Sequence, residues 1–193
     1  MKVDKQQFVS SNPGVKVVFL TADKFEDMEV FFPYFRLLEA GVGVDVAAPA
    51  KEKITGENGY FFENVDRRIA DVNPDDYDVL FIPGGHPDGA PTTVRKMKHA
   101  QEITRSFFAK NKPVAAICHG PYTLVSADVV RGRRLTSYWG DQVPEEIQAA
   151  GGIYEDKEVV VDGNLVTSRW PADLPAFMRE LMKLVNSVKK EKT

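Results

Sequence analysis

The sequence contains a single cysteine among its 193 residues, which excludes an intramolecular disulfide and suits a reducing compartment. Acidic and basic side chains number 28 and 25, so the chain lacks the positive excess that marks nucleic-acid-binding surfaces. It also lacks an apolar run as long as the roughly 20 residues of a membrane-spanning helix, and residues 1–14 contain no secretory signal core. These absences predict a cytoplasmic protein that has neither nucleic-acid nor membrane partners.

What the sequence does contain is a regular alternation of two patterns. Short β-branched runs, typical of strands buried on both faces, alternate with segments whose apolar residues recur at helical spacing. Strands are expected at 15–20, 42–49, 79–85, 113–117 and 134–138, hairpin signals lie in 54–72 and 159–168, and helices are expected at 27–41, 93–109, 119–129, 143–152 and 173–188. Pro33 is expected to kink the first helix or to lie in its first turns. The alternation predicts one α/β domain over 15–189, with a mostly parallel sheet between two helix layers, a polar extension at 1–14 and a tail at 190–193.

The single cysteine, Cys118, lies where the apolar run VAAI ends and a short helical segment begins. A lone cysteine in such a place can be simply a small buried hydrophobe. However, Ala116 and Gly120 stand two residues before and after it, which is the spacing of a nucleophile elbow, where larger side chains would collide. Because this elbow would lie at the carboxyl end of a parallel strand and at a helix N-terminus, it predicts a reactive, acidic thiol in a ligand-binding crevice.

Gly84 and Gly85 follow the neighbouring strand as PGG. An ordinary tight turn would account for them. Two glycines also let the backbone approach a ligand closely, and the N–H groups of Gly85 and His119 would then form an oxyanion site beside the sulfur. The segment GGHPDG has the spacing of neither a dinucleotide fingerprint nor a phosphate loop, so nucleotide binding is not expected.

The three histidines, His86, His99 and His119, narrow the type of cysteine enzyme. None lies beyond residue 119, which excludes a papain-like arrangement because that needs a downstream histidine. Glutaminase domains of class I amidotransferases, which share the elbow, use a downstream His-x-Glu that is also absent. His99 lies in a helical stretch and is expected at the surface, so the candidates are His119 and His86.

Long stretches of the chain resemble the ThiJ/PfpI family, and within it the PfpI-type intracellular proteases. The matching stretches include LTADKFEDMEVFFPYFRLLEAG, DYDVLFIPGG, KPVAAICHGP, GRRLTSY and VVVDGNLVTSRWPADLPAFM. The resemblance implies a flavodoxin-like three-layer α/β/α sandwich of the class I glutamine amidotransferase-like superfamily. In such a fold Cys118 is the nucleophile, His119 its neighbour, and Glu29 hydrogen-bonds the sulfur. The resemblance also implies a homodimer or hexamer, and the family includes cysteine peptidases, cofactor-free glyoxalases, deglycases and redox-sensitive chaperones.

Glu29 also fits this role on physical grounds. It follows the first strand and shares one helix face with Glu26, three residues earlier. A carboxylate beside a thiolate is repelled, so one member of the pair must hold a proton, and a protonated Glu29 can donate it to the sulfur. The alternative is that both glutamates are exposed helix charges. The residues alone would favour that alternative, but because of the family resemblance we assign Glu29 to catalysis and Glu26 to a supporting position.

One stretch departs from the family. PfpI-like proteins typically read PGGRAPE, whose glutamate contacts the histidine of a neighbouring subunit, whereas this chain reads PGGHPDGAPTTV. Three residues are inserted, and Thr92 takes the position of that glutamate. Asp88, inside the insertion, is therefore the candidate acid partner of His119, within the chain or across a subunit interface. The alternative is that no acid takes this role and that peptidase activity is weak or absent.

These residues predict a cysteine-dependent hydrolase or lyase that acts on peptide-like substrates, or on small reactive carbonyls and glycated adducts. Cys118, His119 and Glu29 are its predicted catalytic residues. One cysteine and three dispersed histidines offer no metal-ligand spacing, so neither a metal nor an organic cofactor is expected. The alternative is a stress protein without turnover, a redox sensor or holdase chaperone in which Cys118 is oxidised.

Overall fold

A seven-stranded sheet forms the centre of the structure, a computed structural model that describes residues 5–7 and 14–191. Its strands are β1 (Lys16–Leu20), β2 (Gly43–Ala48), β5 (Arg67–Arg68), β6 (Val79–Ile82), β7 (Val114–Ile117), β10 (Val159–Asp162) and β11 (Leu165–Ser168). They lie in the order β10-β11-β7-β6-β1-β2-β5, and all neighbours are parallel except the β10–β11 hairpin. Two small sheets pair β3 (Ile54–Thr55) with β4 (Phe61–Phe62) and β8 (Arg134–Leu135) with β9 (Ile153–Tyr154).

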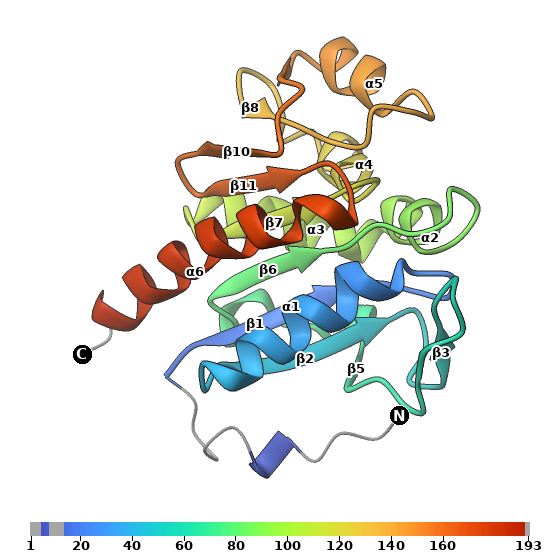
Figure 1. Cartoon of the computed structure of the whole chain (residues 1–193), viewed down its shortest axis with the longest axis vertical. Helices are drawn as coiled ribbons and strands as arrows, with labels where there is room; N and C mark the ends of the chain where they lie inside the picture. The colour runs from blue at the N-terminus through green and yellow to red at the C-terminus, as the bar shows by residue number, and fades with distance from the viewer. Residues whose placement is uncertain (1–4, 8–13, 192–193) are drawn as a thin grey trace.

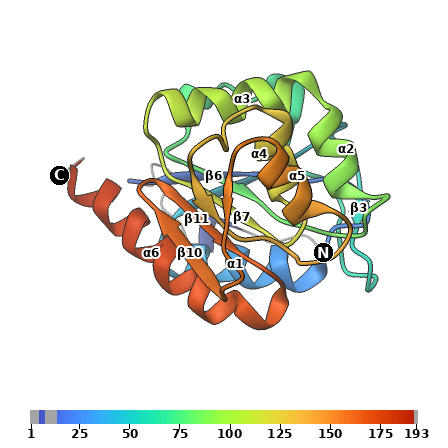
Figure 2. The ribbon, with the colours of Figure 1, turned by 90° about the horizontal axis from the view of Figure 1, so that it is seen from above.

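Helices cover both faces of this sheet. They are α1 (Asp27–Glu39), α2 (Ala90–Lys96), α3 (Lys98–Ala109), α4 (Pro121–Ser126), α5 (Val143–Ala149) and α6 (Leu174–Glu191), with 3₁₀ turns at Lys5–Gln7, Ile69–Asp71, Pro74–Asp76 and Pro171–Asp173. Seen from above, α1 and α6 lie on one face, and α2 and α3 lie on the other (Figures 1 and 2). The predicted three-layer α/β/α sandwich is therefore confirmed. Among the described residues, no helix has both the length and the apolar character needed to cross a membrane.

The continuous apolar runs of the sequence are explained by burial on both sides of the sheet. Every residue of β6 and β7 is buried, as are Val17–Leu20 of β1. Helix α1 contributes Val30, Tyr34 and Leu37 from its inward face. Parallel strands covered by helices on both faces have no solvent side, so they do not alternate between apolar and polar residues.

The elements differ from the predicted ones in a few places. The helix expected at 93–109 is two helices, because Met97 adopts an extended ψ of 119° between α2 and α3. Pro33 lies inside α1, which begins at Asp27, so it falls within the first turns of the helix as expected. Residues 1–4, 8–13 and 192–193 lie outside the described residues, so most of the predicted extension and part of the predicted tail do too. Lys5, inside that extension, forms an ion pair with Asp66 at 2.6 Å.

Candidate active site

The candidate nucleophile follows β7 in a strained turn. Cys118 has φ of 61°, a left-handed conformation that few residues other than glycine adopt. The turn is held on both sides, because the Cys118 N–H donates to the Ser168 carbonyl at 3.1 Å and its own carbonyl accepts from Tyr138 N–H at 2.9 Å. A Cβ atom at Gly120 would lie 2.3 Å from the Ile82 carbonyl oxygen, so the elbow requires glycine there.

His119 lies directly against the sulfur. Its Nδ1 is 3.2 Å from the Cys118 Sγ, and its Nε2 is 2.9 Å from Oδ2 of Asp141. Because Nε2 faces a carboxylate, we assign the ring proton to Nε2, which leaves Nδ1 free to accept the thiol proton. Burial lowers the pKa of His119, although Asp141 opposes this shift, so the ring rests in the neutral form that a base requires.

Asp141 is the carboxylate that contacts His119, and the sequence analysis missed it. It stands in the loop before α5, where both Asp141 and Gln142 have positive φ. The Tyr122 hydroxyl donates to the Asp141 carbonyl and so anchors this loop. The segment YWGDQ carries no motif, and a contact made across a loop from an unrelated element leaves no spacing that could be read from the sequence.

Asp88, the predicted acid partner, is not brought to His119 within the described chain. It is exposed, and its backbone N–H donates to Nδ1 of His86 at 3.2 Å. Thr92, at the position of the family glutamate, donates its hydroxyl to the Pro87 carbonyl. His99 is exposed on α3, as expected.

Glu29 lies on the other side of the sulfur. A Cβ atom at Gly84 would lie 2.6 Å from Oε2 of Glu29 and 3.1 Å from the Cys118 Sγ, so the carboxyl group and the sulfur flank the same glycine. The Gly84 N–H donates to Oε2 at 2.8 Å, whereas Oε1 is fully buried and has no partner among the described residues. The Glu26 carboxylate accepts from the Glu29 N–H at 2.7 Å and caps α1.

Burial controls protonation at this pair. It raises the pKa of Glu29 well above its usual value, and the charge of Glu26 adds to the effect. Burial, and then the carboxyl group of Glu29, raise the pKa of the Cys118 thiol, whereas we expected helix α4 to lower it. Helix α4 is only six residues long, so few peptide dipoles add at its N-terminus. A hydrogen bond from the backbone N–H of His119 opposes this shift and lowers the thiol pKa. Burial raises the pKa of both groups, and Glu29, which has no exposed surface, is the more deeply buried of the two.

These groups share one cavity of about 230 Å³ at the carboxyl ends of β1, β6 and β7. Twelve residues line it: Glu26, Glu29, Glu57, Gly85, His86, Pro87, Cys118, His119, Tyr138, Asp141, Trp170 and Pro171. Cys118 is 7% exposed at its base. The Gly85 N–H, one of the two predicted oxyanion donors, has no protein acceptor among the described residues. No group of three or more metal-ligating side chains occurs in the part of the chain that the structure describes.

Comparison with known proteins places this arrangement in a family. The sequence matches the DJ-1/PfpI family over residues 15–184. "Deglycase PYRAB04690" of Pyrococcus abyssi is 50% identical over 171 residues, which cover 89% of this chain and 99% of the relative. "Protein/nucleic acid deglycase 2" of Escherichia coli is 40% identical over 174 residues, which cover 89% and 98%.

A solved structure shares the fold. It is a two-domain protein from Anabaena variabilis that contains DJ-1/ThiJ/PfpI-like and ferritin-like domains, and it superimposes with a TM-score of 0.84 at 32% identity. The match covers 89% of this chain and 48% of that one. Since the family match spans most of the sequence and the nucleophile elbow stands where the resemblance required it, the chain belongs to the DJ-1/PfpI family.

Proposed function

We propose that the protein is a cysteine-dependent deglycase, an enzyme that removes small dicarbonyl-derived adducts from amines. The observation that carries this proposal is the chain of contacts from Asp141 through His119 to Cys118, at the base of a cavity with Glu29 on its other side. The names of the relatives from Pyrococcus abyssi and Escherichia coli support it. The chain of contacts from Asp141 through His119 to Cys118 would also suit a peptidase, which is the second candidate.

The chemistry begins with proton transfer from Cys118 to Nδ1 of His119. The adduct, an amine bonded to a carbon that carries a hydroxyl group next to a ketone, loses its C–N bond. The electron pair leaves on nitrogen, which takes up the proton from His119. The hydroxyl group gives its proton to the freed Nδ1 of His119 as its carbon becomes an aldehyde, and His119 returns this proton to the same oxygen in the next step. The sulfur then bonds to that aldehyde carbon. The N–H groups of Gly85 and His119 stabilise the oxygen as it gains charge, which completes a hemithioacetal.

Glu29 supplies the remaining proton movements. Protonated Glu29 first gives its proton to the ketone oxygen, and the resulting carboxylate removes the proton from the carbon bonded to sulfur. Glu29 then delivers that proton to the neighbouring carbon and takes back the proton of the hemithioacetal hydroxyl, so the hemithioacetal becomes a thioester without any external oxidant. Water then cleaves the thioester. The sum is adduct plus water giving amine plus a 2-hydroxy acid, and the thiol is restored. The unpartnered Oε1 of Glu29 is the atom that we assign to this transfer.

The cavity favours small substrates over extended polypeptides. Its volume of about 230 Å³ lies below the roughly 300–1,000 Å³ of sites that enclose drug-sized ligands. A non-catalytic redox sensor is less well supported, because oxidation follows thiolate character and exposure, and burial raises the pKa of this thiol.

The test compares three substrates: a peptide treated with methylglyoxal, free methylglyoxal, and a fluorogenic peptide of the casein type. We expect the wild type to release lactate from the first two, and Cys118→Ser to release none. Faster cleavage of the fluorogenic peptide than of the adduct would favour the peptidase. An absence of turnover on all three substrates would contradict the deglycase and the peptidase and would favour the non-catalytic redox sensor.

We also propose that the protein is cytoplasmic and forms a homodimer or hexamer. Met28, Phe32 and Phe35 of α1 are exposed on one apolar face, which lines a groove of about 450 Å³. Light scattering should give a mass of at least twice 21.6 kDa, and Phe35→Glu should lower it. Ile153→Glu, at an equally exposed apolar residue on β9, serves as the control. A wild-type mass of one chain would contradict the proposal.

A further inference from the structure

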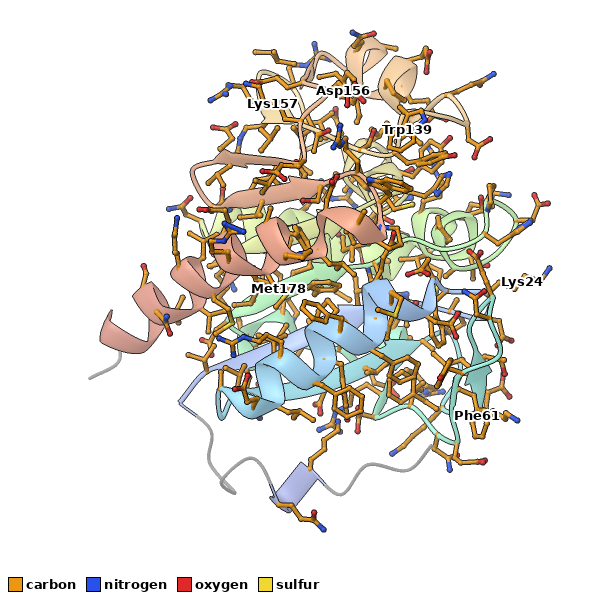
Figure 3. The ribbon with its side chains drawn as sticks, in the orientation of Figure 1. Lys24, Phe61, Trp139, Asp156, Lys157 and Met178 are labelled. Atoms are coloured by element: carbon orange, nitrogen blue, oxygen red, sulfur yellow. The ribbon has the colours of Figure 1, made fainter. Side chains whose placement is uncertain are left out.

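Aromatic rings border the active-site cavity and form a rim, because Tyr138 and Trp170 line the cavity and Trp139 packs against both of them. The chain has two tryptophans, and Trp139 and Trp170 meet here with ring centroids 5.3 Å apart in an edge-on arrangement. Tyr138 extends the rim, 4.9 Å from Trp139 and 4.9 Å from His119. The tryptophans are 49% and 42% exposed. Trp139 lies on the side toward which the strand arrows point (Figure 3). Rings this large, left open to solvent above a nucleophile, offer a stacking surface to a ligand.

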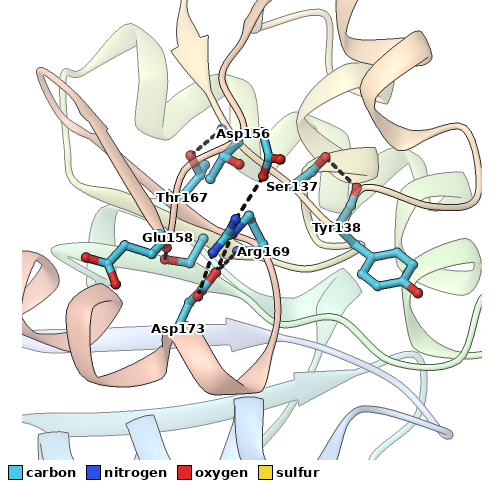
Figure 4. Close-up of polar contacts among 9 residues, drawn as sticks. Ser137, Tyr138, Asp156, Glu158, Thr167, Arg169 and Asp173 are labelled. Carbon is cyan, nitrogen blue, oxygen red and sulfur yellow. Dashed lines mark hydrogen bonds and ion pairs between the residues drawn. The ribbon is translucent and has the colours of Figure 1, made fainter.

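A partly buried ion pair lies against this rim. The Arg169 guanidinium donates to both carboxylate oxygens of the buried Asp173 and to Asp156, and it lies 6.0 Å from the Trp139 ring centroid (Figure 4). Trp170 is the next residue along the chain. Because two carboxylates neutralise Arg169, this arginine offers little charge to an anionic substrate.

The walls of the cavity are acidic, whereas a phosphate or carboxylate substrate would need basic side chains. Glu26, Glu57 and Asp141 line the cavity with Glu29, and no lysine or arginine lines it. Among the described residues, neither Glu26 nor Glu57 forms an ion pair with a basic side chain, and burial raises the pKa of both carboxyl groups.

Glu57 is held at this wall by the backbone rather than by a charged partner. Its N–H donates to the Phe25 carbonyl at 2.9 Å. The carboxylate of the buried Asp27 accepts from the N–H groups of Asn58 and Tyr60, which fixes the turn that carries Glu57. The cavity therefore offers acceptors and aromatic faces, and it lacks a cation.

We propose that the Trp139–Trp170 rim and the Glu57 and Glu26 carboxyl groups form a subsite for a guanidinium, so that the enzyme prefers adducts carried by arginine side chains. This inference rests on the proposed function. A guanidinium is flat, stacks on aromatic faces and presents a fork of N–H donors to carboxylates, whereas a lysine ammonium is a compact and strongly hydrated point charge. The same acidic walls repel the phosphates of a nucleic acid.

Binding tests this subsite without any turnover. In Cys118→Ser protein, tryptophan fluorescence reports only on the rim, because both tryptophans lie there. The probes are N-acetyl-arginine amide, its neutral isostere N-acetyl-citrulline amide, and N-acetyl-lysine amide. We expect arginine to bind at least about fivefold more tightly than either of the others. Adding Glu57→Gln should abolish the preference over citrulline, while Glu63→Gln, at an exposed acid outside the cavity, should keep it. Equal affinities for arginine and citrulline would overturn the proposal.

Kinetics extend the test to the reaction. The ratio of kcat/KM for a methylglyoxal-treated arginine peptide to that for free methylglyoxal should fall roughly tenfold in Trp170→Ala and in Glu57→Gln, through KM, and should not change in Glu63→Gln. A methylglyoxal-treated guanosine monophosphate that reacts faster than the arginine peptide would contradict the proposal and favour a nucleobase. If no adduct turns over in the wild type but arginine still binds preferentially, the proposed function fails and the guanidinium subsite stands.

Discussion

At the scale of single residues, two carboxyl groups, those of Asp141 and Glu29, lie on different sides of the Cys118 sulfur and have different roles. Asp141 is half-exposed and its Oδ2 accepts the hydrogen bond of the His119 Nε2–H, so it orients the ring from the solvent side. Glu29 has no exposed surface and its carboxyl group is held by the Gly84 N–H. Burial thus distinguishes the two carboxyl groups, because it raises the pKa of Glu29, and we assign Glu29 to proton transfer and Asp141 to orienting His119.

Asp141→Asn should reduce activity by more than tenfold. The amide can donate to Nε2 and favour the wrong tautomer of His119, and the loss in a serine protease with this change is about 10⁴-fold. The half-exposed position of Asp141 makes a smaller loss expected here, because solvent screens its charge. Asp88→Asn is the matched control, measured by kcat/KM in parallel. A large loss in Asp88→Asn and none in Asp141→Asn would return the role to Asp88, acting across a subunit interface.

Glu29→Gln and Glu29→Ala should change the reactivity of Cys118 differently. Both substitutions remove the carboxyl group that raises the pKa of the thiol, but only the amide can still donate to the thiolate. We expect the thiol pKa to be lowest in Glu29→Gln and higher in Glu29→Ala. The rate of alkylation by iodoacetamide, followed as the pH is raised, measures this pKa because the thiolate is the reacting form. Indistinguishable profiles in all three proteins would mean that Glu29 does not act on the sulfur.

At the scale of elements, the site forms where three parallel strands end together. Strand β7 leads into the elbow, β6 leads into Gly84 and Gly85, and β1 leads into the turn before α1, which carries Glu29. Gly84 must be glycine because the Glu29 carboxyl group and the Cys118 side chain meet over it. The close approach of these two groups is therefore a property of the turn after β6 as much as of either side chain.

Gly84→Ala should therefore damage both stability and activity. The added Cβ would lie 2.6 Å from Glu29 Oε2 and 2.7 Å from the Cys118 Cβ, in a buried place where neither can move freely. Overpacking of this kind costs about 1–3 kcal/mol. We expect a lower midpoint of guanidinium unfolding and a loss of kcat that exceeds the loss of folded protein. Gly14→Ala, where a Cβ would meet nothing within 4 Å, should match the wild type. Full activity in Gly84→Ala would show that the Glu29–Cys118 contact is dispensable.

The elements themselves were largely predictable, because buried parallel strands leave long apolar runs. The four central strands, the β10–β11 hairpin and the elbow all follow from local patterns. The break between α2 and α3 at Met97 could not be predicted in this way, since RKMKHA contains neither glycine nor proline. Asp141 could not be predicted, because its contact with His119 spans 22 residues and depends on how the loop before α5 folds back. The thiol pKa was predicted in the wrong direction, because burial cannot be read from the residues beside the cysteine.

At the scale of the whole molecule, the buried acid ties stability to pH. The pKa of Glu29 is raised in the folded protein, so between the usual value of 4.5 and the folded value the native state holds a proton that the unfolded chain has released. This contribution to stability is present in full below about pH 4.5 and is lost as the pH rises toward the folded pKa. His119 has the opposite sign, because its lowered pKa removes stability as the pH falls below about 6.5.

Glu29→Gln removes the first of these two effects and leaves the second. The free energy of unfolding of Glu29→Gln, relative to that of the wild type, should therefore increase from about pH 5 to about pH 8. Chemical denaturation at several pH values measures this difference, and Glu63→Gln controls for the loss of one surface carboxylate. A difference that stays constant with pH would mean that Glu29 is ionised in the folded protein over this range.

The pairing of β11 with β7 joins the mouth of the cavity to its base. Ser168 lies opposite Ile117, and its carbonyl accepts from the Cys118 N–H. Trp170 therefore stands two residues after a residue that is hydrogen-bonded to the nucleophile. Changes of length or sequence after Ser168 would alter which molecules are admitted, while the backbone that presents the sulfur is retained. Substrate selectivity and thiol reactivity therefore depend on neighbouring strands that can vary separately. The segment after Ser168 is thus a suitable place to change the substrate while the nucleophile is kept.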